Sequence, residues 1–159
     1  MRTLRWAAVI AGALLLVIQV VRPAKSNPAV DEHKTIQAST ALPTAVGAIL
    51  DRSCNDCHSS KTQWPWYSNI APASWYLVYD VNEGRKELSF SDWGSYDTRR
   101  TAKKLQEICE QLEKGKMPKW EYVLFHPAAK LSEADRRLFC DWAKQERAHV
   151  LGAQAGSRQ

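Results

Sequence analysis

The chain has 159 residues, seven of them tryptophan, and a formal net charge of +5, which leaves room for one ordinary domain and a targeting segment. Four basic residues flank an N-terminal apolar run, so that 18 Lys and Arg stand against 17 Asp and Glu in the rest of the chain. Binding of a polyanion needs a basic surplus on the folded domain, and its absence excludes nucleic acid as an expected partner.

The first element is the apolar run itself, residues 6–21, which reads WAAVIAGALLLVIQVV with Gln19 as its one clearly polar residue. A short basic segment followed by an apolar run is typical of a secretory signal. Residues 1–23 are therefore predicted to form a signal or anchor helix. The run is slightly shorter than the ~20 residues of a comfortable bilayer span, although snorkelling arginines and Trp6 could extend it. Because a clean small-x-small cleavage site is missing, we favour a retained membrane anchor over a removed signal peptide, and we expect the following domain to be exported.

Residues 24–39 are polar, lack periodicity and contain Pro28, so they are predicted to be a linker in which His33 is solvated. The domain itself is assigned to residues 40–151, and a flexible tail to residues 152–159.

Four helical stretches are expected in this domain. The first runs from about Pro43 to Cys57, and the second starts near Ala73. Their apolar faces are formed in turn by Val46, Ile49, Leu50 and Cys54, and by Trp75, Val78, Tyr79 and Val81.

The third stretch begins at Asp97 or Thr98 as a cap and should end at Gly115. The fourth begins with a capping box at Ser132. Apolar residues at helical spacing are Leu105, Ile108, Cys109 and Leu112 in the third, and Leu138, Phe139, Trp142 and Ala143 in the fourth. Since no stretch alternates with period two over a useful length, the predicted fold class is all-α.

The chemistry lies in the sequence Cys54-Asn55-Asp56-Cys57-His58, a C-x-x-C-H motif. This motif attaches c-type haem, because two sulfurs at this spacing reach the two vinyl groups of one porphyrin and the next residue offers an imidazole to the iron. A thioredoxin-like redox pair would need a βαβ setting, and a zinc site would need four paired ligands. A simple disulfide between the two cysteines is the plain alternative in an exported protein. We expect one covalent haem c per chain, held by Cys54, Cys57 and His58.

The stretch from Cys54 to Trp142 resembles the haem-binding domain family of small exported bacterial c-type cytochromes. The resemblance rests on CNDCHSS, WPWYSNIAP (64–72), DVNEGR (80–85), FSDW (90–93), MP (117–118) and HPAAKLS (126–132). It implies a small, cytochrome c-like helical domain around one covalent haem.

Two residues compete for the distal side of the iron. Met117 is the only methionine besides the first residue, and it precedes a proline where small cytochromes c present a thioether. His126, in Phe125-His126-Pro127, is the competing ligand, and an open sixth position is the third reading.

Further residues are candidates for the haem pocket or for a disulfide. Four aromatic residues could line the haem pocket or could be plain core: Trp64, Trp66, Tyr67 and Trp75. Arg85 could pair a haem propionate or be a surface charge. Cys109 and Cys140 lie on apolar helix faces and could form a disulfide or remain buried thiols.

The expected function is one-electron transfer, without substrate turnover, by a His/Met-ligated haem tethered to the bacterial inner membrane and facing the periplasm. Redox partner proteins are implied but not identified. A haem-based sensor, or an electron-delivery subunit of a periplasmic oxidoreductase or peroxidase, is the alternative.

Overall fold

The computed structural model describes residues 1–156, and every regular element within them is a helix. The long helices are α1 (Arg2–Ile18), α3 (Thr44–Ser53), α5 (Ala73–Glu87), α6 (Thr98–Glu113) and α8 (Glu133–Gly156). Short helices lie between them: α2 (Ile36–Ser39), α4 (Asn55–His58) and α7 (Trp120–Phe125), with single turns η1 (Glu32–Lys34), η2 (Trp66–Asn69), η3 (Trp93–Ser95) and η4 (Pro127–Ala129). The predicted all-α class is confirmed.

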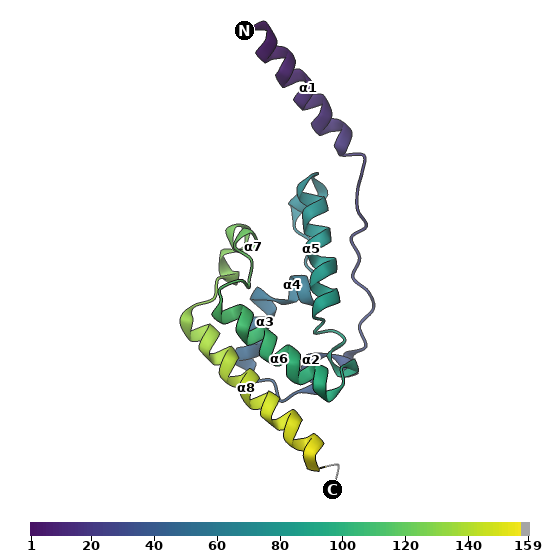
Figure 1. The fold of residues 1–159 in the computed structure, drawn as a ribbon. Helices are drawn as coiled ribbons and strands as arrows, with labels where there is room; N and C mark the ends of the chain where they lie inside the picture. Colours follow the sequence, from purple (N-terminus) through teal and green to yellow (C-terminus); the bar gives the residue numbers. More distant parts are fainter. Residues whose placement is uncertain (157–159) are drawn as a thin grey trace.

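The hydrophobic core joins α3, α6 and α8, which lie together in the lower half of Figure 1. Its most deeply buried members include Val46, Leu50, Leu105 and Phe139, each at most 1% exposed. These are apolar residues at three- and four-residue spacing, so the core follows directly from the sequence pattern. The cap at Asp97 accepts from Arg100 N at 2.7 Å, and Gly115 adopts φ 64°, as predicted for the two ends of α6.

Helix α5 stands apart from this core and faces α7 across the upper part of the domain (Figure 1). Its buried side chains are Ser74, Val78 and Val81, while Tyr79 is 63% exposed, so the predicted apolar face is wrong at Tyr79. The predicted apolar face of α8 is likewise wrong at Leu138, which is 43% exposed. The predicted flexible tail starts too early, because α8 continues through residues 152–156, and residues 157–159 lie outside the described part.

The N-terminal helix differs from the predicted membrane-spanning anchor. Helix α1 projects away from the domain (Figure 1), but it has only 17 residues, about 26 Å at the usual rise, against a hydrocarbon core of ~30 Å. Among residues 1–156, no helix is both long enough and apolar enough to cross a membrane, which corrects the expected membrane-spanning anchor.

The predicted linker is also shorter than expected. Ile36 is fully buried, and its N–H donates to the carbonyl of Phe90 at 2.9 Å. The turn η1 and helix α2 pack so closely on η3 that a Cβ on Gly94 would lie 2.8 Å from Ser39 Oγ. Residues 35–39 are therefore part of the domain, which the polar sequence around one isoleucine did not indicate.

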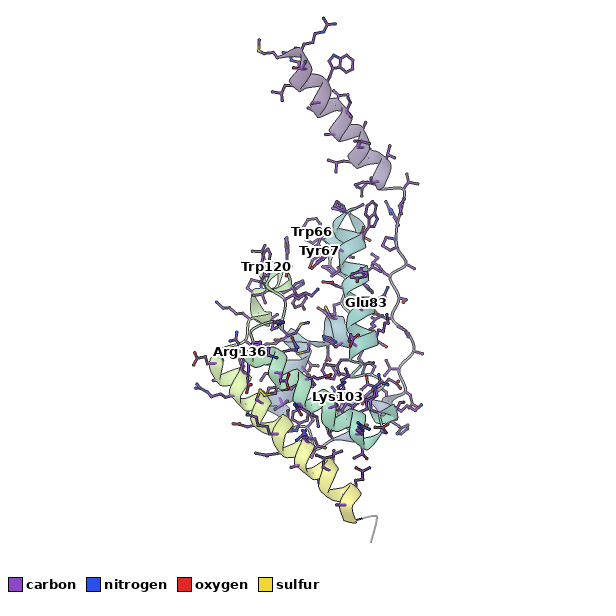
Figure 2. All side chains as sticks on the ribbon, viewed as in Figure 1. Trp66, Tyr67, Glu83, Lys103, Trp120 and Arg136 are labelled. Atoms are coloured by element: carbon purple, nitrogen blue, oxygen red, sulfur yellow. A yellow bond between two sulfur atoms is a disulfide. The ribbon has the colours of Figure 1, made fainter. Side chains whose placement is uncertain are left out.

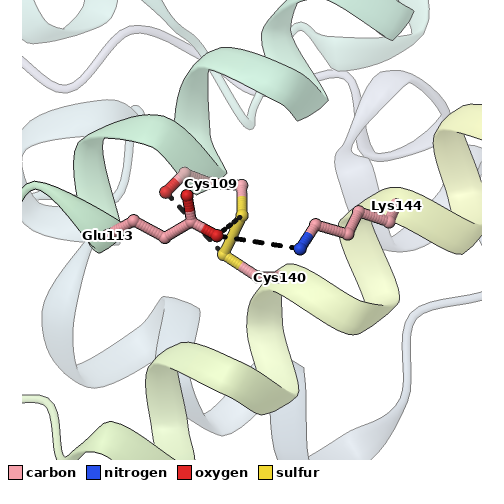
Figure 3. The surroundings of a disulfide bond; sticks show 4 residues. All are labelled: Cys109, Glu113, Cys140 and Lys144. Atoms are coloured by element: carbon pink, nitrogen blue, oxygen red, sulfur yellow. Dashed lines mark hydrogen bonds and ion pairs between the residues drawn. A yellow bond between two sulfur atoms is a disulfide. The ribbon is translucent and has the colours of Figure 1, made fainter.

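A disulfide joins Cys109 of α6 to Cys140 of α8. Of the two alternatives for these cysteines, a disulfide or a pair of buried thiols, the structure therefore contains the disulfide. Both cysteines are buried, and the Glu113 carboxylate lies beside them with Lys144 Nζ at 3.7 Å (Figure 3). The bond closes a loop of 31 residues between the two longest helices of the core.

Replacing both cysteines of this disulfide, Cys109→Ser with Cys140→Ser, should lower the free energy of unfolding by about 3–4 kcal/mol, because the unfolded chain regains the freedom of that loop. Urea unfolding of the haem-loaded protein measures the difference, and reduced wild type should approach the variant. Equal midpoints for the oxidised wild type and the variant would show that the cross-link contributes nothing.

Candidate functional site

A cavity of about 540 Å³ lies between α5, α7 and the C-x-x-C-H segment. This volume is within the usual range of small-molecule and cofactor sites, about 300–1,000 Å³. Its wall is mainly apolar and aromatic: Trp66, Tyr67, Ile70, Ala73, Tyr76, Leu77, Met117, Pro118, Tyr122 and Phe125. A smaller hollow of about 230 Å³ lies between α6 and α8; half of the described residues that line it are charged, and none of them is aromatic.

Cys54, Cys57 and His58 all line the large cavity. The first predicted helix is interrupted here, since α3 ends at Ser53 and Cys54 leaves the helical region with φ −130° and ψ −39°. A single new turn, α4, then carries the second cysteine and the histidine. The interruption places both sulfurs and the imidazole on one wall of the cavity.

Both cysteines of this motif are free thiols, so the alternative of a Cys54–Cys57 disulfide is not what the structure contains. Burial raises the pKa of Cys54 to about 12 and that of Cys57 to about 11, with smaller contributions from neighbouring negative charge. The thiols are therefore expected to be protonated at neutral pH.

The imidazole of His58 is held by backbone carbonyls of α5 and the residue after it. Its Nδ1 lies 2.9 Å from Gly84 O and 3.1 Å from Leu88 O. Carbonyls only accept hydrogen bonds, so Nδ1 carries the proton and Nε2 keeps its lone pair for a metal. Burial lowers the pKa of His58, which keeps the ring neutral as ligation requires.

Gly84 allows this arrangement because it brings α5 against the haem motif. A Cβ at this position would lie 2.5 Å from the carbonyl oxygen of Cys57. This role was not predicted from the sequence, although an isolated glycine inside a helical pattern often marks a close approach of two backbones.

The structure distinguishes the two candidates for the distal side, because Met117 lines the cavity and His126 does not. Met117 lines the same cavity as His58 and also packs against the hydrophobic core. The His126 ring stacks behind this lining on Tyr122, with centroids 4.2 Å apart, and its Nδ1 lies 3.1 Å from Tyr122 O. The cavity therefore brings together His58 and Met117.

Of the four aromatic residues predicted for the pocket, two line the cavity. Trp66 and Tyr67 lie between the upper ends of α5 and α7 (Figure 2), with Trp66 72% exposed. Trp75 instead donates from Nε1 to Val21 O at 2.7 Å, and Trp64 is half-buried outside the lining.

Arg85 has a structural role in place of the suggested propionate contact. Its guanidinium donates to Ser59 O, Ser26 O, Asn27 Oδ1 and Thr62 Oγ1, at 2.7–2.9 Å. These bonds fasten the N-terminal segment and the loop after the haem motif to α5. Among the described residues of the cavity lining, Lys119 is the only lysine or arginine, and it is bound to Asp80.

Helix α7 and its polar contacts were not predicted. Tyr122 donates to Asp56 Oδ2 at 2.6 Å, inside the haem motif. Burial, and then this hydrogen bond to a carboxylate, raise the pKa of Tyr122, so its hydroxyl remains a donor at neutral pH. A six-residue helix between two prolines carries too little periodicity to be found from sequence.

These residues fit a haem c. Two free thiols, an imidazole with one nitrogen free and a thioether line one apolar cavity of adequate volume. Thioether, imidazole and apolar walls are the groups with which proteins hold such a macrocycle.

The comparisons with known proteins agree with this chemistry. A family model described as a haem-binding domain matches residues 13–145. No curated protein and no solved structure matches the chain.

Proposed function

Because this chain belongs to the haem-binding domain family, we propose that it holds one haem c as thioethers of Cys54 and Cys57 and serves as a one-electron carrier. His58 is the proximal ligand in this proposal, and Met117 is the distal ligand. The observation that carries it is the pairing of Nδ1 of His58 with two carbonyls, facing a cavity that Met117 also lines.

The bound haem supplies an iron that alternates between the ferric and ferrous states. The protein's own residues perform the remaining tasks. Gly84 O and Leu88 O fix the orientation of the His58 ring, and the thioether of Met117 would hold the haem from the cavity side and exclude exogenous ligands. The apolar side chains of the wall would limit the access of water to a bound haem. Such a site passes an electron to redox partner proteins and turns over no substrate.

An exported location is part of this proposal. Basic residues followed by an apolar run open the chain, as in secretory signals. The Cys109–Cys140 disulfide adds support, because disulfides persist in oxidising compartments such as the bacterial periplasm.

The distal ligand is tested by Met117→Ala in protein made by a host that attaches c-type haem. Ferrous wild type should resist carbon monoxide, whereas the variant should bind it fully, since the thioether no longer occupies the sixth position. Optical spectra with and without carbon monoxide measure the change. The matched control is His126→Ala, which should behave like wild type. Immediate, complete carbon monoxide binding by ferrous wild type, as fast as in Met117→Ala, would refute the His/Met pair.

A haem-based ligand sensor is the second candidate. The observation that favours it is that every side chain of α7 is partly or fully exposed. The helix next to Met117 therefore has little packing to keep it against the cavity. Rapid carbon monoxide binding by wild type would support this function.

A further inference from the structure

Helix α7 follows Met117-Pro118 directly and forms one side of the cavity opposite α5 (Figures 1 and 2). Its outward residues Trp120 and Leu124 are 73% and 65% exposed. With so little burial, side-chain contacts across the cavity must contribute much of what keeps α7 in place.

Three polar contacts join α7 and the residue before it to the opposite wall. The longest runs from Tyr76 OH to Glu121 Oε1 at 3.5 Å, and the other two are short. Lys119 Nζ lies 2.8 Å from Asp80 Oδ1 on α5, and Asp80 is only 13% exposed. Tyr122 OH lies 2.6 Å from Asp56 Oδ2, in the turn that carries Cys57 and His58. Each of these two short contacts involves a charged, partly desolvated group, and such hydrogen bonds are the stronger kind.

The same contacts determine where Met117 lies. On its N-terminal side the loop is fastened to α6, since Gln111 O accepts from Lys116 N at 3.0 Å and from Met117 N at 3.4 Å. On its C-terminal side the loop continues into Lys119 and Tyr122. Their partners lie on α5, whose carbonyls hold His58, and within the haem motif, so the thioether is positioned relative to the proximal histidine.

We propose that Lys119 and Tyr122 are positioning residues that hold Met117 at the sixth coordination position, and that release of α7 is the motion that opens this position. The inference rests on the proposed His58/Met117 pair and adds the residues that control it. Loss of one hydrogen bond to a charged group should raise the open population roughly 10-fold or more.

The test is Tyr122→Phe in the haem-loaded, full-length protein. This change removes only the hydroxyl and keeps the ring that stacks on His126. The rate of carbon monoxide binding to ferrous protein, limited by release of Met117, should rise roughly 10-fold, while covalent haem content stays that of wild type. The matched control is Tyr79→Phe, at a tyrosine of α5 that is 63% exposed, which should leave the rate unchanged.

The second contact is tested separately with Lys119→Met and Lys119→Arg. Lys119→Met should accelerate carbon monoxide binding, and Lys119→Arg should restore most of the wild-type rate, because it keeps a cation for Asp80. A purely structural role would lower the unfolding midpoint of both Tyr122→Phe and Lys119→Met without changing this rate.

The failure of this inference can be told apart from failure of the proposed function. If wild type resists carbon monoxide, and Tyr122→Phe and Lys119→Met resist it equally, α7 does not position Met117 and the inference is wrong. If wild type binds carbon monoxide at once, the His58/Met117 pair is wrong and the inference fails with it.

Discussion

Protein in which Cys54→Ser is combined with Cys57→Ser should contain no covalently attached haem. A serine hydroxyl does not add to a vinyl group as a thiol does, so both thioether bonds are lost. His58 and the apolar cavity remain in this variant. Any haem it retains should therefore be fully extractable into acidified organic solvent, whereas essentially none should leave wild type. Absorbance of the extract measures the difference.

The disulfide pair provides a matched control for this experiment. Cys109→Ser with Cys140→Ser removes the same number of sulfur atoms from the other side of the core, away from the cavity lining. This control should keep its haem covalent while losing stability. Haem that resists extraction from the Cys54/Cys57 variant would show that the attachment chemistry has been assigned to the wrong residues.

The second large effect is expected for Gly84→Ala. The new methyl group would lie 2.5 Å from Cys57 O, so either α5 or the haem motif must move. Either movement displaces Gly84 O from Nδ1 of His58, now at 2.9 Å. Overpacking of this kind typically costs about 1–3 kcal/mol. We expect a lower unfolding midpoint and a reduced yield of covalent haem, measured by urea unfolding and by haem absorbance per chain.

A glycine elsewhere in the helices shows what the substitution does without the close contact. An added Cβ at Gly152 of α8 meets no atom within 4 Å. Gly152→Ala should therefore be neutral or stabilise the protein by up to about 1 kcal/mol, as alanine does inside a helix. Effects of the same sign at Gly84 and Gly152 would mean that the contact with Cys57 is unimportant.

The parts of the fold that sequence predicted well are those with long amphipathic repeats. Helices α6 and α8 bury the residues that their spacing indicates, with a cap at Asp97 and a terminal glycine at Gly115. The predictions for Leu138 and Tyr79 were wrong, since both side chains are exposed: each directly neighbours a buried residue in the sequence, and an apolar residue type alone does not show on which side of the helix it lies.

The parts that sequence did not predict depend on contacts between distant segments. The backbone N–H of buried Ile36 donates to the carbonyl of Phe90, and no local sequence pattern indicates that these two residues are neighbours. Helix α7 is six residues long and is held by partners far along the chain. Short-range patterns contain no information about such contacts.

The candidate site also has a part that the sequence indicated and a part that it did not. Cys54, Cys57 and His58 are adjacent in sequence and carry their chemistry in their spacing, so the motif could be identified directly. The carbonyls that orient His58 come from Gly84 and Leu88, and a backbone oxygen has no sequence signature. Only the geometry of the cavity shows that Met117 lines it and that His126 does not.

The most direct test of the central claim is the intact mass of the denatured wild-type chain, purified from a host that assembles c-type haem. We predict a single species heavier than the polypeptide by the mass of one haem, with only Cys109 and Cys140 in disulfide form. A chain with the mass of the polypeptide alone, or with a second disulfide at Cys54 and Cys57, would contradict covalent haem attachment and with it the electron-carrier function.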